Sequence, residues 1–88
     1  MKILYFYSNA CGCCHKWKPV LDDLCSEYDA NYEAINADTN YDLKAKYGVH
    51  GLPLTLFLND DEKEVGNIIG NMKKEFAKKC FDKYLLHK

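Results

Sequence analysis

The apolar side chains of this chain follow two spacings, and each change of spacing marks a new predicted element. Apolar positions three and four residues apart predict helices at 13–28, 39–48 and 72–86. Short runs rich in β-branched and aromatic residues predict strands at 2–7, 32–37, 54–58 and 64–69. The polar run at 59–61 predicts a turn, so the last two strands should form an antiparallel hairpin.

The two long predicted helices each bury one face. In the first, the apolar face consists of Trp17, Val20, Leu21, Leu24, Cys25 and Tyr28. In the last, it consists of Phe76, Cys80, Phe81, Tyr84 and Leu85. Pro19 lies inside the first helix, where it removes a backbone hydrogen bond and should bend the axis. Thr39 or Asn40 can cap the short middle helix, and Gly48 ends it.

The element order β-α-β-α-β-β-α predicts an α/β fold, a four-stranded mixed sheet with helices on both faces. We expect residues 1–88 to form one domain, because a chain of this length has room for one limited core. In such a sheet, the loop at the carboxyl end of the first strand is a natural position for a functional site.

The composition of the chain limits which classes of partner it can bind and indicates the cellular compartment. A net charge of -1 gives no electrostatic footprint for nucleic acid, and no basic amphipathic helix indicates a membrane surface. The apolar run after Lys2 is too short for a signal peptide, and no stretch approaches the roughly 20 apolar residues of a membrane span. Five cysteines, three of them crowded together, indicate reactive or metal-binding thiols in a reducing compartment. We expect a cytoplasmic, soluble protein, and a monomer.

The cysteine cluster Cys11-Gly12-Cys13-Cys14 lies between the first predicted strand and the first predicted helix, and it contains a Cys-x-x-Cys pair. A thiol in the first turn of a helix meets unpaired backbone N–H groups and the positive end of the helix dipole. Both favour the thiolate, which is the reactive form. Cys11 is therefore the candidate nucleophile. Because it lies at the helix boundary, it should be more exposed than Cys14, which is one turn inside.

At this point the sequence resembles the thioredoxin superfamily, over nearly the whole chain. The cysteine cluster followed by Pro19 is similar to the family's Cys-Gly-Pro-Cys site and the proline that kinks its first helix. The segment 47–57, Tyr-Gly-Val-His-Gly-Leu-Pro-Leu-Thr-Leu-Phe, resembles the family segment with a cis-proline opposite the active site, here Pro53. Further matches to the pattern are Asn36, Asp38 and Gly70.

This resemblance implies a thiol–disulfide oxidoreductase that reduces protein disulfides. Cys11 would attack the substrate disulfide and form a mixed disulfide, which Cys14 would resolve. Pro53, if cis, would place the backbone of Leu52 beside the thiols, where it could pair with an extended substrate. The exchange needs no bound cofactor, and electrons would come from a thioredoxin-reductase-like enzyme or from glutathione.

Three positions depart from the thioredoxin pattern. Ala10 stands where the family usually has a tryptophan before the nucleophile, so part of the usual substrate-contact surface is missing. Tyr5 and Ala34 stand where thioredoxins place a buried acid and its lysine partner. The proton transfer that helps Cys14 attack must then come from water or another group.

Two other functions stay open on the sequence. One is a glutathione-linked, glutaredoxin-like enzyme, because the chain begins directly at the active-site strand as glutaredoxins do, although it lacks their usual Thr-Val-Pro at 51–53. The other is a metal-binding module that uses Cys11, Cys13 and Cys14, with His15 as a fourth ligand. A Cys-x-x-Cys pair often supplies two of the four ligands of a zinc site, but this sequence has no second such pair.

Three residues beside the pair are candidates for tuning its redox chemistry: Gly12, Cys13 and His15. Cys13 replaces the family's proline and restores an N–H that can hydrogen-bond the sulfur of Cys11, or it competes for the mixed disulfide. A charged His15 would favour the thiolate, although a solvent-facing histidine is the simpler interpretation. Core packing is the expected role of Trp17, Cys25 and Cys80.

Overall fold

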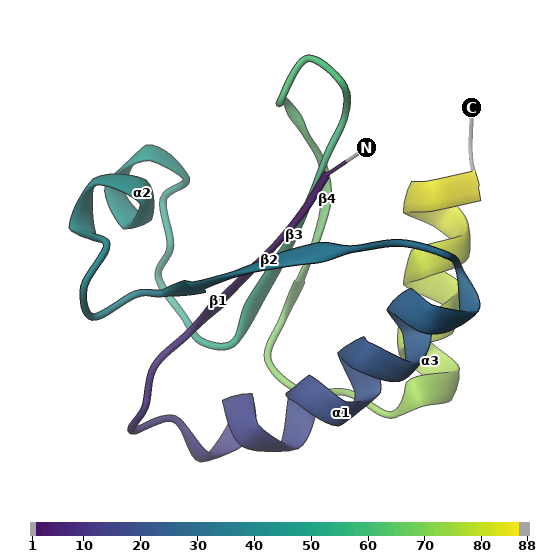
Figure 1. Ribbon diagram of the computed structural model, residues 1–88, viewed down its shortest axis with the longest axis horizontal. Helices are drawn as coiled ribbons and strands as arrows, with labels where there is room; N and C mark the ends of the chain where they lie inside the picture. The colour runs from purple at the N-terminus through teal and green to yellow at the C-terminus, as the bar shows by residue number, and fades with distance from the viewer. Residues whose placement is uncertain (1, 87–88) are drawn as a thin grey trace.

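The computed structural model describes residues 2–86 and arranges four strands in one mixed sheet (Figure 1). The strands are β1 (Lys2–Tyr7), β2 (Tyr32–Asn36), β3 (Leu54–Leu58) and β4 (Glu64–Ile69). The helices are α1 (Gly12–Glu27), α2 (Tyr41–Lys46) and α3 (Lys74–Phe81), and α3 continues into a π-helical turn, Asp82–Leu86. The strand order is β2-β1-β3-β4, with β1 parallel to β2 and antiparallel to β3, which is antiparallel to β4. The predicted four-stranded mixed sheet is confirmed.

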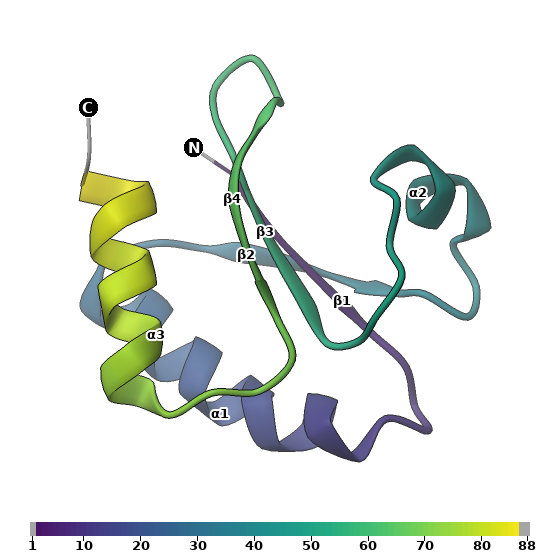
Figure 2. The same cartoon turned by 180° about the vertical axis from the view of Figure 1, so that it is seen from behind.

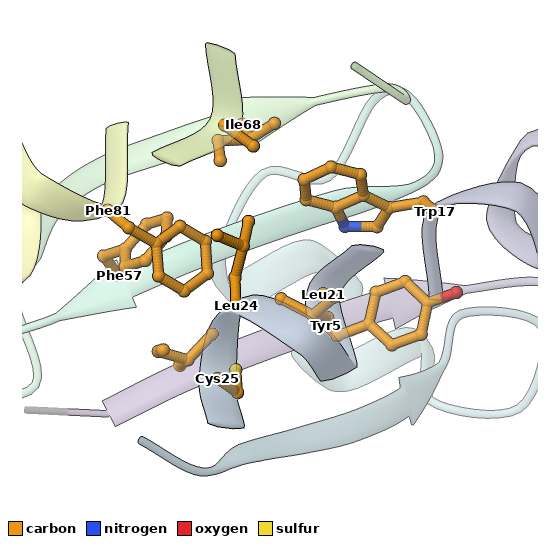
Figure 3. Packing of buried hydrophobic residues seen from close by; sticks show 10 residues of the cluster. Tyr5, Trp17, Leu21, Leu24, Cys25, Phe57, Ile68 and Phe81 are labelled. Atoms are coloured by element: carbon orange, nitrogen blue, oxygen red, sulfur yellow. The ribbon is translucent and has the colours of Figure 1, made fainter. Parts of the chain in front are cut away.

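Helices α1 and α3 cover one face of the sheet, and α2 lies on the other (Figures 1 and 2). Alternate residues of the strands point to opposite faces, so each face has its own apolar cluster. The cluster beneath α1 and α3 is shown in part in Figure 3, and its buried members are Ile3, Tyr5, Trp17, Leu21, Leu24, Cys25, Phe57, Ile68, Ala77 and Phe81. Trp17 and Cys25 are core residues, as the helical spacing predicted.

The opposite face has a thinner cover. Its buried residues are Leu4, Phe6, Ile35, Val49, Leu54, Leu56 and Leu58. Of these, Val49 comes from the loop after α2, and the partly buried Leu43, Tyr47 and Leu52 pack against the cluster. No residue of α2 itself is buried. The sheet is therefore enclosed mainly by α1 and α3.

The last helix differs from its prediction. Residues 72–86 do not form one regular helix, because α3 begins after Lys73 at its N-cap and changes to the π-helical turn after Phe81. Phe76 was predicted to be buried, but it is 53% exposed and lies beside the Lys79 ammonium. With Phe81 in the core, a residue five positions earlier lies on the opposite side of the helix, and Ala77 takes the buried position. Cys80 is half-buried against the core.

The two ends of α2 are formed by Asn40 at its N-terminus and by the turn through Gly48 after its C-terminus. Asn40 occupies the N-cap, as predicted, but its side-chain amide donates to the carbonyl of Asn36 at 2.8 Å and makes no capping hydrogen bond to the helix. The regular helix ends at Lys46, and Gly48 follows with a φ of 60°, a left-handed conformation that suits glycine.

Among the residues described, no helix combines the length and apolarity that crossing a membrane requires.

Candidate active site

The loop between β1 and α1 is held in place by Ser8. This residue is only 8% exposed, and its hydroxyl donates to Asp38 Oδ2 at 2.7 Å. The Ser8 hydroxyl also accepts the Ala10 N–H at 3.3 Å, and the Ser8 carbonyl accepts the Cys11 N–H at 3.1 Å. Asp38 is a match to the family pattern, but the contact between Asp38 and Ser8 was not predicted. The available signal was that Ser8 is the first polar residue after an apolar strand.

Cys11 is the N-cap residue of α1. Its sulfur accepts a hydrogen bond of 3.2 Å from the backbone N–H of Cys14, and the residue is partly exposed. A hydrogen bond of this kind, at the positive end of a helix, is stronger to a thiolate than to a thiol. The expected backbone donor to this sulfur was Cys13, but the amide that donates belongs to Cys14.

Cys14 is the buried member of the pair, with 2% of its surface exposed. Burial raises the pKa of its thiol from 9.0 to about 11, the side chain of Cys11 acts in the same direction, and a backbone hydrogen bond from Ser8 opposes both. Both cysteines are free thiols. The predicted difference in exposure between Cys11 and Cys14 is confirmed, and it leaves one sulfur accessible and the other sheltered beside it.

The three residues considered for tuning lie on the solvent side of this pair. The side chain of Cys13 is exposed, and a Cβ added at Gly12 would meet nothing within 4 Å. The approach to Cys11 along this side is therefore open. His15 is exposed, as expected, and its Nε2 lies 3.4 Å from the carbonyl oxygen of Asn9.

The Leu52–Pro53 segment lies at the same end of the sheet as the cysteine loop. In the β1–β3 register, Phe6 is opposite Leu54, and the next step places the end of β1 beside Pro53. The Leu52–Pro53 peptide bond is cis. Pro53 is fully buried, and Leu52 is partly exposed at the surface of this end of the sheet.

Two buried hydrogen bonds lie beneath the site. The Tyr5 hydroxyl donates to the carbonyl of Cys14 at 2.9 Å, and the indole N–H of Trp17 donates to the Thr55 hydroxyl at 2.8 Å. Neither bond was predicted, since each joins α1 to a strand and depends on how the helix packs on the sheet. Figure 3 shows the hydroxyl of Tyr5 directed away from the aromatic rings of Phe57 and Phe81.

The geometry does not support the metal-binding alternative. Within residues 2–86, no group of three or more His, Cys, Asp and Glu side chains is arranged to hold a metal ion. The Cys13 side chain is exposed while that of Cys14 is buried, so the ligand set considered for this alternative does not converge.

Comparison with known proteins identifies the family. The family model described as Thioredoxin matches residues 1–83, and the chain belongs to this family. A thioredoxin of Staphylococcus epidermidis is 33% identical over 87 residues, which cover 97% of this chain and 83% of that protein. A thioredoxin of Pyropia yezoensis is 29% identical over 82 residues, which cover 91% and 76%.

Solved structures agree in fold. Thioredoxin 1 from Thermosipho africanus TCF52B superposes with a TM-score of 0.83 at 24% identity, covering 98% of this chain and 96% of that one. A mutant thioredoxin from Halobacterium salinarum NRC-1 gives a TM-score of 0.81 at 30% identity, covering 93% and 72%. With the family and the fold established, the chain is a thiol–disulfide oxidoreductase.

Proposed function

We propose that the protein reduces disulfide bonds in protein substrates, with Cys11 as the nucleophile and Cys14 as the resolving thiol. The observation that carries this proposal is the difference between the two sulfurs. Cys11 is partly exposed and its sulfur is hydrogen-bonded by a helix N-terminal amide, whereas Cys14 is 2% exposed with a raised pKa. A large substrate disulfide therefore meets Cys11 first.

The chemistry proceeds in two exchanges. The Cys11 thiolate attacks one sulfur of the substrate disulfide, a Cys11–substrate disulfide forms, and the other substrate sulfur leaves as a thiolate that takes up a proton. Cys14 then loses its proton and attacks the Cys11 sulfur, which releases the second substrate thiol. The substrate gains two electrons and two protons, and the protein is left with a Cys11–Cys14 disulfide.

The substrate backbone is proposed to lie against Leu52 and Pro53. This segment adjoins the carboxyl end of β1, and Leu52 is partly exposed there. An extended peptide can pair with an exposed backbone segment in the manner of an added strand. Disulfide peptides that carry an N-methyl group on the amide beside their cysteine should then be reduced more slowly, although their disulfide is unchanged.

Tuning of the pair is assigned to the residues beside it, Gly12, Cys13 and His15. All three are exposed next to the cysteines, so substitutions there alter the surroundings of the sulfurs without disturbing the core. The expected readout is the reduction potential of the Cys11–Cys14 pair, measured for Cys13→Pro and His15→Ala against the unaltered protein.

The first test is equilibration of the protein with defined ratios of reduced and oxidised dithiothreitol, followed by alkylation and mass-spectrometric mapping. Joint protection of Cys11 and Cys14 at a potential near about -270 to -200 mV would support a reductant of protein disulfides. Pairing through Cys13, or the lack of any two-electron step, would contradict the proposal.

The second test assigns the two roles and the electron donor. Cys14→Ser should accumulate a substrate mixed disulfide at Cys11, whereas Cys11→Ser should accumulate none. A thioredoxin-reductase-like donor should support turnover that needs both thiols. Turnover with glutathione alone, and by Cys14→Ser as well, would favour the glutathione-linked alternative.

A further inference from the structure

The hydroxyl of Tyr5 is bonded directly to the main chain of Cys14. Tyr5 is 3% exposed, and its O–H donates to the Cys14 carbonyl oxygen at 2.9 Å. This bond attaches the first turn of α1 to the sheet at the residue whose side chain faces Cys11. Burial and the neighbouring thiols raise the pKa of the Tyr5 hydroxyl well above its usual value, so it stays protonated and remains a donor.

The surroundings of this bond contain no buried carboxylate or amine among the residues described. The buried polar residues other than Tyr5 are Ser8 and Thr55. The titratable groups that face Tyr5 and Cys14 are thiols and phenols, namely Cys11, Cys13, Tyr7 and Tyr32.

Two carboxylates belong to residues that contact neighbours of Tyr5 and Cys14 and not the Cys14 thiol itself, and both form hydrogen bonds or ion pairs with other side chains. Asp38 accepts the Ser8 hydroxyl at 2.7 Å. Asp22 accepts the Tyr32 hydroxyl at 2.6 Å and pairs with Lys18 at 3.1 Å. Neither is positioned by a contact to the Cys14 thiol, so the side chains around this thiol offer no general base.

We propose that Tyr5 is a positioning residue that holds Cys14 for the resolving step, and that Cys14 gives its proton to solvent rather than to a protein base. The inference rests on the proposed roles of Cys11 and Cys14. In the step concerned, the Cys14 thiol loses its proton to solvent, its thiolate forms a bond to Cys11 Sγ, and the bond between Cys11 and the substrate sulfur breaks. The substrate sulfur leaves with the electron pair and is protonated by solvent.

A two-phase reaction with dithiobis(nitrobenzoate) isolates this step. In a common background with Cys13→Ser and Cys80→Ser, attack by Cys11 releases one thionitrobenzoate, and attack by Cys14 on the resulting mixed disulfide releases the second. Tyr5→Phe removes the hydroxyl and keeps the ring. Tyr7→Phe is the matched control, since Tyr7 stacks on Tyr5 from the same strand with ring centroids 5.6 Å apart.

The expected result is that Tyr5→Phe slows the second release about fivefold, the effect of one ordinary hydrogen bond, and leaves the first unchanged. Tyr7→Phe should change neither. With Tyr5 intact, the second rate should rise about tenfold per pH unit between about pH 6 and pH 9, because only the ionisation of Cys14 controls it.

Three results would overturn the inference. The second release could be equally fast in Tyr5→Phe, or both releases could slow equally, which would indicate a general structural effect. A plateau of the second rate near neutral pH with Tyr5 intact would reveal a protein base, and this measurement does not depend on the folding of Tyr5→Phe. Failure of the proposed function looks different, because no second release would then occur even with Tyr5 intact.

Discussion

The indole N–H of Trp17 and the hydroxyl of Thr55 form a hydrogen bond of 2.8 Å between two residues that are both 0% exposed. Trp17 belongs to α1, one turn after Cys14, and Thr55 belongs to β3, two residues after Pro53. The two segments that form the candidate active site are thus joined by a buried polar contact as well as by apolar packing.

Replacing Thr55 should therefore reduce stability more than its size suggests. Thr55→Val keeps the shape of the side chain but leaves the indole N–H buried without this acceptor, at an expected loss of about 1–3 kcal/mol in the free energy of unfolding. Urea unfolding followed by the fluorescence of the single tryptophan measures it. Thr39→Val, at an exposed threonine, is the control and should change little. Equal stability of both variants would refute the expectation.

The capping role of Cys11 can be separated from its proposed redox role. Its sulfur accepts the N–H of Cys14 at the N-cap, so Cys11→Ala should lose about 1 kcal/mol of stability under reducing conditions. Cys11→Ser should keep the cap, because serine is a favoured N-cap residue, and both variants should be inactive. Urea unfolding of the two variants is the measurement. A serine variant no more stable than the alanine variant would show that the sulfur contact contributes nothing to the helix.

Stability of the reduced protein should fall at high pH. Burial raises the pKa of Cys14 and of Cys25 from 9.0 to about 11, so the folded protein keeps protons that the unfolded chain releases. The two thiols make their full contribution to the free energy of unfolding below about pH 9, and this contribution is lost as the pH rises toward 11. The loss is at most about 1.4 kcal/mol per thiol for each pH unit.

Urea unfolding at a series of pH values between these limits measures the slope. Cys25→Ala removes one of the two buried thiols, so the slope of this variant should be shallower. A stability that is flat or rises across this range would contradict the assigned direction of the two shifts.

The contacts of Ser8 should control the mobility of the cysteine loop. Ser8→Ala removes the acceptor of the Ala10 N–H and the donor to Asp38, so the amide of Ala10 should exchange faster with solvent deuterium. Hydrogen exchange resolved by residue makes the comparison, with Ser26→Ala at an exposed position of α1 as the control. Unchanged exchange at Ala10 in the Ser8 variant would show that the loop is held by other contacts.

Much of this fold can be predicted from the spacing of apolar residues along the sequence. Strand positions were predicted within about one residue because each run of apolar residues has turn-forming neighbours, and the exposure of Cys11 relative to Cys14 followed from their places in a helical turn. Phe76 was assigned wrongly because an aromatic residue at the margin of an apolar stripe fits either side, and only the packing of Phe81 decides the rotation of the helix.

The polar contacts of the site could not be predicted from the spacing of residues in the sequence. Ser8 and Asp38 are 30 residues apart, and Trp17 and Thr55 are 38 apart, so each contact exists only after the sheet has formed. The hydroxyl of Tyr5 was a similar case. The resemblance to thioredoxins placed Tyr5 where that family usually has an acid, but which atom the Tyr5 oxygen would contact depends on the packing of α1 on β1.

The thin cover provided by α2 has a consequence for the order in which the protein opens. Detaching the segment that contains α2 opens only the smaller cluster, and none of the residues of α2 itself is buried, whereas detaching α1 or α3 opens the main cluster. We expect the first partial unfolding event to release residues 41–52 while the remaining layers persist. The chain that leads to Pro53 is then the least protected against proteolysis, and the cysteine helix belongs to the part that survives longest.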